Sequence, residues 1–238
     1  MNKLKTTLFA ACSLVLVTIG TSVKADSSNF AGPYIGVSAS GYGIQLAGEA
    51  STSPTGASLT REIDQVSLGQ VAPVTGFEAG YAIPLGSAFL IDLGAAYYSG
   101  SAKLDFHEDR AIAAACTNCT ATVTGSKDVT FTIGDLWIGY IAPTIVLSDT
   151  SSLYVKLGLS EASVDVTGDV TRPADLSGTT WAIGTRTVLD SGIFIRTEAG
   201  YTDYNGISAH GKGNTGGIAS STSYSAEPTI AFGTVSLG

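Results

Sequence analysis

Apolar and polar side chains alternate with a period of two over most of this 238-residue chain. Between residues 193 and 202, the odd positions begin with Ile193 and Ile195, whereas the even positions carry Arg196 and Glu198. Successive side chains of a β-strand point to opposite faces, so this period predicts strands rather than helices. Each predicted strand then has one apolar face and one face with the polar and charged residues.

The alternation predicts eight strands in four hairpins. They cover residues 33–43, 76–84, 89–100, 129–147, 153–164, 180–189, 193–202 and 228–238. Tight turns alternate with polar loops, and the loops are expected at 48–70, 105–127, 165–178 and 204–223. An even strand count with short turns on one rim and long loops on the other is typical of outer-membrane barrels. The sequence therefore predicts an all-β fold, an eight-stranded antiparallel up-and-down transmembrane β-barrel, with most strands near the roughly 9–11 residues that cross a bilayer.

One predicted strand, 129–147, departs from simple alternation. Phe131 and Ile133 share one parity, whereas Leu136 and Ile138 share the other. A β-bulge near Gly134 and Asp135 would reconcile the two halves, because one extra residue reverses the parity. A strand that begins only at Leu136 is the alternative.

In lipid, the apolar parity is predicted to face outward and the charged parity to line the barrel interior. The predicted interior charges are Glu78, Asp92, Lys156, Arg186, Arg196 and Glu198. Acids and bases occur together, so they can neutralise one another, which favours a structural network over an ion path. Outward aromatic residues near strand ends, expected at the membrane interface, are Tyr81, Tyr97, Tyr140, Trp181 and Tyr201.

The start of the chain predicts export. Lys3 and Lys5, an apolar run and a small-x-small end before Ala25 are typical of a secretory signal peptide, here residues 1–25, with the barrel domain at 26–238. The formal net charge is −8, and it becomes −11 without this peptide, which contains three lysines and no acid. An acidic balance of this size argues against nucleic acid as a partner.

Three stretches carry a resemblance to a known family. "FAGPYIGVSASGYG" near the start, the "GFEAGYAIPLG" hairpin and "IFIRTEAGYTDY" resemble the small eight-stranded outer-membrane barrels of Gram-negative bacteria, which include the opacity-type proteins and the barrel domain of OmpA. The resemblance implies a monomeric surface barrel. We expect it to be non-enzymatic, to be surrounded by lipid and lipopolysaccharide, and to be inserted by the barrel assembly machinery. The resemblance also implies exposed loops with a role in envelope integrity, adhesion or immune contact. The family usually closes with an aromatic residue, whereas this sequence ends in "TVSLG", as expected of a shortened end or of assembly through internal strand signals.

Two other functions fit parts of the pattern. A narrow porin or ion channel of the same fold would use the interior charges, and planar-bilayer recording would separate it from a closed barrel. A soluble lipocalin-like barrel would need charged outer faces on its strands, and these are absent from the pattern.

Candidate chemistry is sparse. Cys116 and Cys119 are the only cysteines after residue 25, and in an exported loop they predict a local disulfide, with free thiols or a metal site as alternatives. Ser208 and His210 lie two residues apart in a Gly-rich stretch with no orienting acid beside them, which a nucleophile requires. No catalytic residue, cofactor or metal site is predicted.

Overall fold

The computed structural model describes residues 26–54, 62–113, 122–168, 170–211 and 220–238. Within these ranges it contains one 3₁₀ helix and nine strands. Their bounds are η1 Ser27–Phe30, β1 Gly32–Pro54, β2 Glu62–Pro84, β3 Phe89–Ala113, β4 Thr122–Ser148, β5 Ser151–Thr167, β6 Leu176–Val188, β7 Phe194–Tyr204, β8 Ile207–His210 and β9 Ser220–Leu237. Across the described ranges, no helix is both long and apolar enough to cross a membrane. The predicted signal peptide, 1–25, lies outside the described residues.

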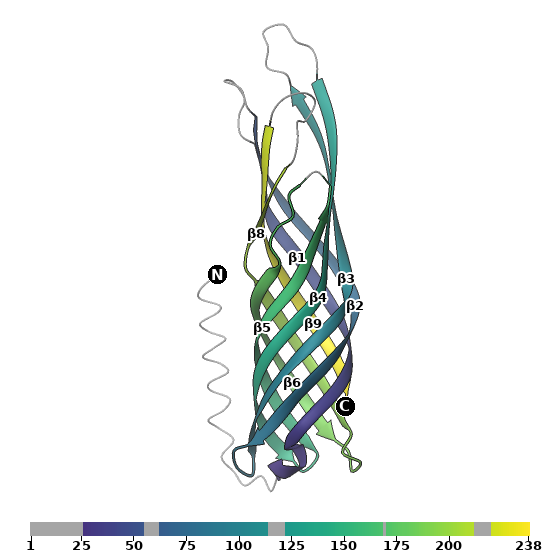
Figure 1. Cartoon of the computed structure of the whole chain (residues 1–238), viewed down its shortest axis with the longest axis vertical. Helices are drawn as coiled ribbons and strands as arrows, with labels where there is room; N and C mark the ends of the chain where they lie inside the picture. Colours follow the sequence, from purple (N-terminus) through teal and green to yellow (C-terminus); the bar gives the residue numbers. More distant parts are fainter. Residues whose placement is uncertain (1–25, 55–61, 114–121, 169, 212–219) are drawn as a thin grey trace.

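Eight of the strands close into a ring (Figure 1). Strands β1 to β7 pair antiparallel with their neighbours in chain order, β7 then pairs with β9, and β9 pairs with β1. The short β8 pairs with β9 beyond the point where β7 ends. This confirms the predicted eight-stranded antiparallel barrel.

Side chains alternate between interior and exterior in the part of the barrel next to the tight turns. In β6 and β7, buried and exposed positions alternate almost without exception. Large apolar side chains such as Ile35, Phe77 and Leu159 point outward and are exposed. We call this outward zone the apolar belt, because a closed ring can hide its backbone polar groups while it presents such a surface to lipid.

The loop predictions were wrong in extent. Residues 48–54 and 62–70, predicted as loop, belong to β1 and β2, and most of 105–127 belongs to β3 and β4. The stretch 204–223 contains β8 and the start of β9. The stretch 165–178 includes the last residues of β5 and the first residues of β6. Backbone pairing between hairpin partners continues here, and the alternation is reversed where side chains are described, with Ile44 and Leu104 buried and Gln45 and Lys103 exposed.

The extended strands form two arms, whose lower parts still enclose the barrel interior and whose upper parts stand beyond it (Figure 1). We call residues 43–54 of β1 with 62–74 of β2 the β1–β2 arm, which β9 flanks. The β3–β4 arm consists of residues 100–113 and 122–134. The arms stand at the end opposite the tight turns, which we call the loop end.

The bulge in β4 is confirmed. The β4–β5 register shifts between Gly134 and Trp137, and Asp135 takes a positive φ of 47°. As a result, Phe131 and Ile138, which have opposite parities, are both buried inside the barrel. The expectation that the apolar parity of this strand faces lipid was therefore wrong. These apolar residues face the barrel interior, and Trp137 points outward and is 56% exposed.

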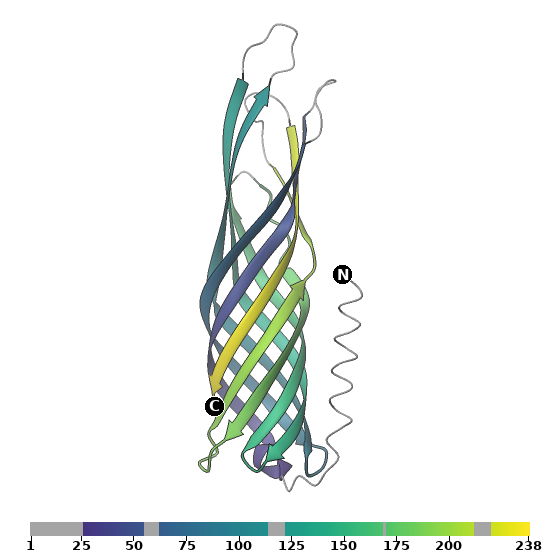
Figure 2. The same ribbon diagram turned by 180° about the vertical axis from the view of Figure 1, so that it is seen from behind.

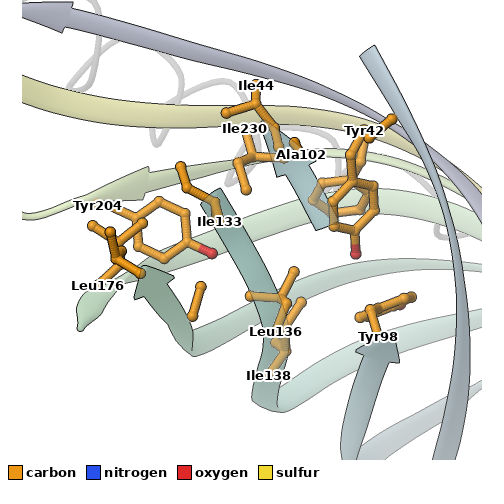
Figure 3. Close-up of a cluster of buried hydrophobic side chains, with 14 of the residues drawn as sticks. Tyr42, Ile44, Tyr98, Ala102, Ile133, Leu136, Ile138, Leu176, Tyr204 and Ile230 are labelled. Carbon is orange, nitrogen blue, oxygen red and sulfur yellow. The ribbon is translucent and has the colours of Figure 1, made fainter. Parts of the chain in front are cut away.

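Two apolar clusters fill the barrel interior. The loop-end cluster includes Tyr42, Ile44, Tyr98, Ile133 and Phe232, and Figure 3 shows most of these side chains turned toward one another. The turn-end cluster consists of Phe30, Tyr34, Ala82, Leu90, Val146 and Phe194. Side chains rather than an open channel occupy both ends of the interior.

The turn-end cluster is closed by the N-terminal segment. Ser27 donates its backbone N–H to Ser87 O at 2.9 Å, and Asn29 donates to Asp149 O at 3.1 Å, which ties η1 to two of the tight turns. The backbone N–H of Ser28 donates to the Asp26 carboxylate at 2.9 Å and holds the pKa of Asp26 below its usual value. Phe30, 1% exposed, is thereby held inside the end of the barrel.

Candidate functional site

All six predicted interior charges lie inside the barrel, between the two apolar clusters. We call Glu78, Asp92, Lys156, Arg186, Arg196 and Glu198 the charged layer. Each is buried, and they come from β2, β3, β5, β6 and β7. Three cationic groups face three carboxylates, so the layer is formally neutral.

Arg196 links β7 to the opposite wall. Its Nη1 donates to Glu78 Oε2 at 2.9 Å, and its Nη2 donates to Asp92 Oδ2 at 3.4 Å. The guanidinium also lies 4.9 Å from the Tyr34 ring centroid and 5.0 Å from that of Tyr154. A planar guanidinium can satisfy several partners at once, so Arg suits a position that joins three strands in a dry interior.

Lys156 and Glu198 form the second ion pair of the layer. Lys156 Nζ lies 2.5 Å from Glu198 Oε2, which also accepts a 2.9 Å hydrogen bond from the Tyr154 hydroxyl. The ammonium lies 4.4 Å from the centroid of the Tyr140 ring. Both charges are therefore paired, as a buried ion pair must be if its desolvation cost is to be offset.

Arg186 is held differently. Among the described residues, no carboxylate lies within ion-pairing distance of its guanidinium, which instead donates from Nη1 to Phe30 O at 3.4 Å. The guanidinium lies 4.5 Å from the Phe194 ring centroid and 5.0 Å from that of Tyr34. Aromatic faces and one backbone carbonyl thus replace a counter-ion, in agreement with the weak hydration of guanidinium.

Tyr140 corrects one of the aromatic predictions. It was predicted at the outer interface, but it is 6% exposed and points into the barrel. Its hydroxyl shares a 2.9 Å hydrogen bond with Tyr34 and accepts from Arg196 Nη1 at 3.5 Å. The physical reason is the β4 bulge, which turns the parity of Tyr140 inward.

The other four predicted interfacial aromatics lie on the outer wall. Tyr81 and Trp181 are exposed, and Tyr97 and Tyr201 are partly exposed. Two pairs form there, Tyr97 with Trp137 at a 4.6 Å centroid distance and Trp181 with Tyr201 at 5.9 Å. Trp137 was missed in the sequence, although its parity, counted after the proposed bulge, gave the signal.

Other interior residues were also missed. Tyr34, Tyr154 and Thr144 contact the charged layer, and Thr144 Oγ1 lies 3.5 Å from Asp92 Oδ2. Tyr34 and Tyr154 share the interior parity of their strands, so periodicity indicates their direction. Their partners lie on other strands and could not be assigned from the sequence.

Ser208 and His210, the residues considered for catalysis, lie in the short strand β8. Both are exposed, and the His210 backbone N–H donates to Thr171 Oγ1 at 2.9 Å. In the part of the chain that the structure describes, no group of three or more His, Cys, Asp or Glu side chains is placed to hold a metal. Cys116 and Cys119, with their predicted disulfide, lie outside the described residues.

An outer groove of about 590 Å³ lies beside the ends of β6 and β7. Its lining includes Leu159, Glu161, Thr179, Asp203 and Glu227. Two buried hydroxyls in its wall, Ser160 and Tyr204, share a 3.0 Å hydrogen bond with each other. The groove is open, and its lining includes none of the six residues of the charged layer.

Comparison with known proteins identifies the class of barrel. Residues 11–225 match the family described as "Outer membrane protein beta-barrel domain". A comparison with curated protein sequences finds no match.

Solved structures show a likeness in fold. The outer membrane protein OprG from Pseudomonas aeruginosa has 12% identity and a TM-score of 0.46, covering 91% of this chain and 99% of that one. Ail, the attachment invasion locus protein of Yersinia pestis, in complex with the heparin analogue sucrose octasulfate, has 10% identity and a TM-score of 0.32, covering 83% and 98%. The outer membrane protease OmpT from Escherichia coli has 10% identity and a TM-score of 0.39, covering 84% and 96%.

Proposed function

Because the chain belongs to the outer membrane protein beta-barrel domain family and resides in the bacterial outer membrane, we propose that it is a non-enzymatic barrel that anchors an extracellular contact surface. The observation that carries the proposal is the length of its strands. β4 extends over 27 residues and β3 over 25, whereas a tilted strand needs roughly 9–11 residues to cross hydrocarbon. The excess forms the two arms at the loop end.

The filled interior supports an anchoring role over transport. The charged layer lies between two apolar clusters, and its ion pairs join opposite walls instead of lining an open path. Phe30 blocks the turn end, next to Arg186. In an eight-stranded barrel, side chains of ordinary size are enough to fill the lumen.

The surface role that we propose is adhesion or immune contact, or stabilisation of the envelope. In this proposal the barrel is a monomer, lipid and lipopolysaccharide surround the apolar belt, and the barrel assembly machinery inserts it. The arms then act as the parts of the protein that meet molecules outside the cell.

Bacteria that display either the full chain or a variant with shortened arms would test the proposal. The variant lacks residues 51–64 and 106–128, and both proteins are first shown by heat-modifiable gel migration to be folded in the outer membrane. We expect cells with the full chain to bind host cells or matrix proteins and cells with the variant to lose that binding. Equal binding by the two, with equal resistance of both strains to detergents, contradicts the proposal.

A narrow ion channel is the second candidate, favoured by the six ionisable side chains within the barrel. Planar-bilayer recording separates the two functions. We expect no reproducible conductance steps from the purified protein. Steps that are abolished by Arg196→Ala would instead establish a channel.

A further inference from the structure

The barrel wall is split between β2 and β3. These strands pair only from Thr75 with Ser99 down to Pro84 with Leu90. Beyond Thr75, the described part of β2 pairs only with β1, and β3 beyond Gly100 pairs only with β4. Figures 1 and 2, from opposite sides, both show the β1–β2 arm and the β3–β4 arm separating toward the loop end.

Two residues explain why pairing stops at this point. Pro73 has no N–H to donate, yet it lies within the unbroken β1–β2 ladder opposite Gly41, so its nitrogen faces the β3 side. Across from it, Gly100 has a φ of +153°, and the β3–β4 register shifts between Tyr98 and Ser101. The split is therefore built into the sequence, because both strands change at the same level.

The split leaves a row of unpaired backbone groups on β2. Backbone groups of successive residues point to alternate sides of a strand, so the odd residues that precede Pro73 share its direction toward the split. Ser67, Gly69 and Val71 belong to this set, and the β1–β2 register from residues 62 to 82 shows no shift that would change it. Unpaired strand edges of this length are templates for pairing with another chain.

An apolar pocket lies at the foot of the split. It has a volume of about 20 Å³, and its lining includes Ala72 and Val74 from β2, Gly100 and Ala102 from β3, and Tyr42. The pocket has room for one small apolar group. A strand that enters the split would place such a group there.

The charge of the two edges indicates the chemistry of the occupant. Residues 62–74 and 100–113 together contain five carboxylates, Glu62, Asp64, Asp105, Glu108 and Asp109, against two bases, Lys103 and Arg110. Charge complementarity across an interface favours a cationic partner and disfavours an anionic one.

We propose that the split between β2 and β3 binds an extended, positively charged peptide segment of a partner protein, which adds to the free edge of β2 as a further strand. Backbone hydrogen bonds to the odd residues of β2 supply the affinity, and a small apolar side chain enters the pocket beside Val74. The acidic balance of the stretches 62–74 and 100–113 favours lysine and arginine in the segment over aspartate and glutamate. The inference rests on the proposed surface role and names the partner chemistry for it.

Purified full-length protein in lipid nanodiscs tests this with three synthetic peptides of about ten residues, the length of a typical strand. The first alternates lysine with valine, the second alternates glutamate with valine, and the third alternates lysine with proline, which keeps the charge but removes half of the N–H donors. We expect the lysine–valine peptide to bind at least about tenfold more tightly than either of the others. Hydrogen exchange should then show new amide protection between residues 63 and 73.

A matched pair of variants locates the contact. Ser67→Pro removes one N–H that faces the split, whereas Ser67→Ala keeps it, and gel migration shows whether both remain folded. Loss of one strand hydrogen bond should weaken lysine–valine binding about fivefold in Ser67→Pro and leave it unchanged in Ser67→Ala.

Several results would overturn the inference. Equal binding of the two lysine peptides would show that charge alone acts. New protection at residues 203–206 beside the outer groove, instead of on β2, would place the ligand elsewhere, and a doubled mass without peptide would make a second copy the occupant. Cell binding that survives Ser67→Pro refutes the split as the contact but leaves the proposed surface role intact, whereas absent cell binding by the full chain refutes that role even if the peptide binds.

Discussion

The barrel at the level of the apolar belt and the two arms are made from the same strands. They differ in how many neighbouring strands each strand pairs with. At belt level every strand pairs on both sides, and the interior joins distant strands, as Arg196 does with Glu78 and Asp92. In the arms, β2 and β3 pair on one side only. The comparison predicts that stability is concentrated in the barrel, because the described parts of the arms have strand edges without a neighbour.

The largest expected effect comes from Arg196→Met. This change leaves Glu78 and Asp92 as buried carboxylates without their cation, which costs about 3–5 kcal/mol. Urea unfolding of the protein in lipid vesicles, followed by heat-modifiable gel migration, measures the loss. Lys103→Met, an exposed position in the β3–β4 arm, is the control, and an equal loss in both variants would remove the distinction between the two regions.

Overpacking of the barrel wall comes next. A Cβ on Gly184 would lie 2.4 Å from the Tyr154 ring and 2.5 Å from the Thr197 carbonyl oxygen, whereas a Cβ on Gly139 meets nothing within 4 Å. We expect Gly184→Ala to lower the free energy of unfolding by about 2–3 kcal/mol. The same unfolding assay should show almost no change for Gly139→Ala, and similar values for the two would mean that the interior is loosely packed.

Tyr154→Phe should have a smaller effect on the barrel. It removes the hydroxyl that donates to Glu198 at 2.9 Å, while Lys156 remains as the partner of that carboxylate. The expected loss is about 1.5 kcal/mol, because the acceptor is charged and buried. Tyr81→Phe, on the exposed outer wall, serves as the comparison, and no loss at Tyr154 would show that water can replace its hydroxyl inside the barrel.

The smallest effect is expected in the arms. Thr130→Ala removes an exposed hydrogen bond of 2.7 Å to Asp105, and water can take its place, so stability should change by less than about 0.5 kcal/mol. Equilibrium unfolding measures it together with the barrel variants. A change as large as that of Arg196→Met would show that the arms contribute to global stability as much as the barrel does.

The same comparison explains what could be predicted from the sequence. At belt level, lipid outside and packed side chains inside require strict alternation, so the inward direction of Arg196 and Glu198 and the outward direction of Ile195 follow from parity alone. The closed ring and the bulge near Gly134 also follow. Partners across the barrel, such as Tyr154 with Glu198, depend on which strands face one another and are not local properties.

The arms could not be predicted by the same reasoning. In the described parts of the arms, polar residues such as Gln45 and Lys103 face outward and apolar residues such as Ile44 and Leu104 face inward, which is the reverse of the belt. The prediction for Tyr140 was wrong because it assigned the apolar residues of β4 to the lipid face. The apolar residues on both sides of the bulge face the barrel interior instead. Pro73 and Gly100 can be read from the sequence. That they lie side by side in the barrel wall depends on the β2–β3 register, which the sequence does not give.

Cysteine labelling in intact outer membranes tests the central claim most directly, which is that the barrel has an apolar outer surface and a closed interior. Single cysteines replace the outward residues Leu159 and Val235, 73% and 57% exposed, and the buried inward residues Thr180 and Thr234, in a chain that carries Cys116→Ser and Cys119→Ser. We expect a lipid-soluble maleimide to label the two outward positions and a water-soluble maleimide to label none of the four. Labelling of Thr180→Cys or Thr234→Cys by the water-soluble reagent in a folded barrel would contradict the account, because it would show an open aqueous path.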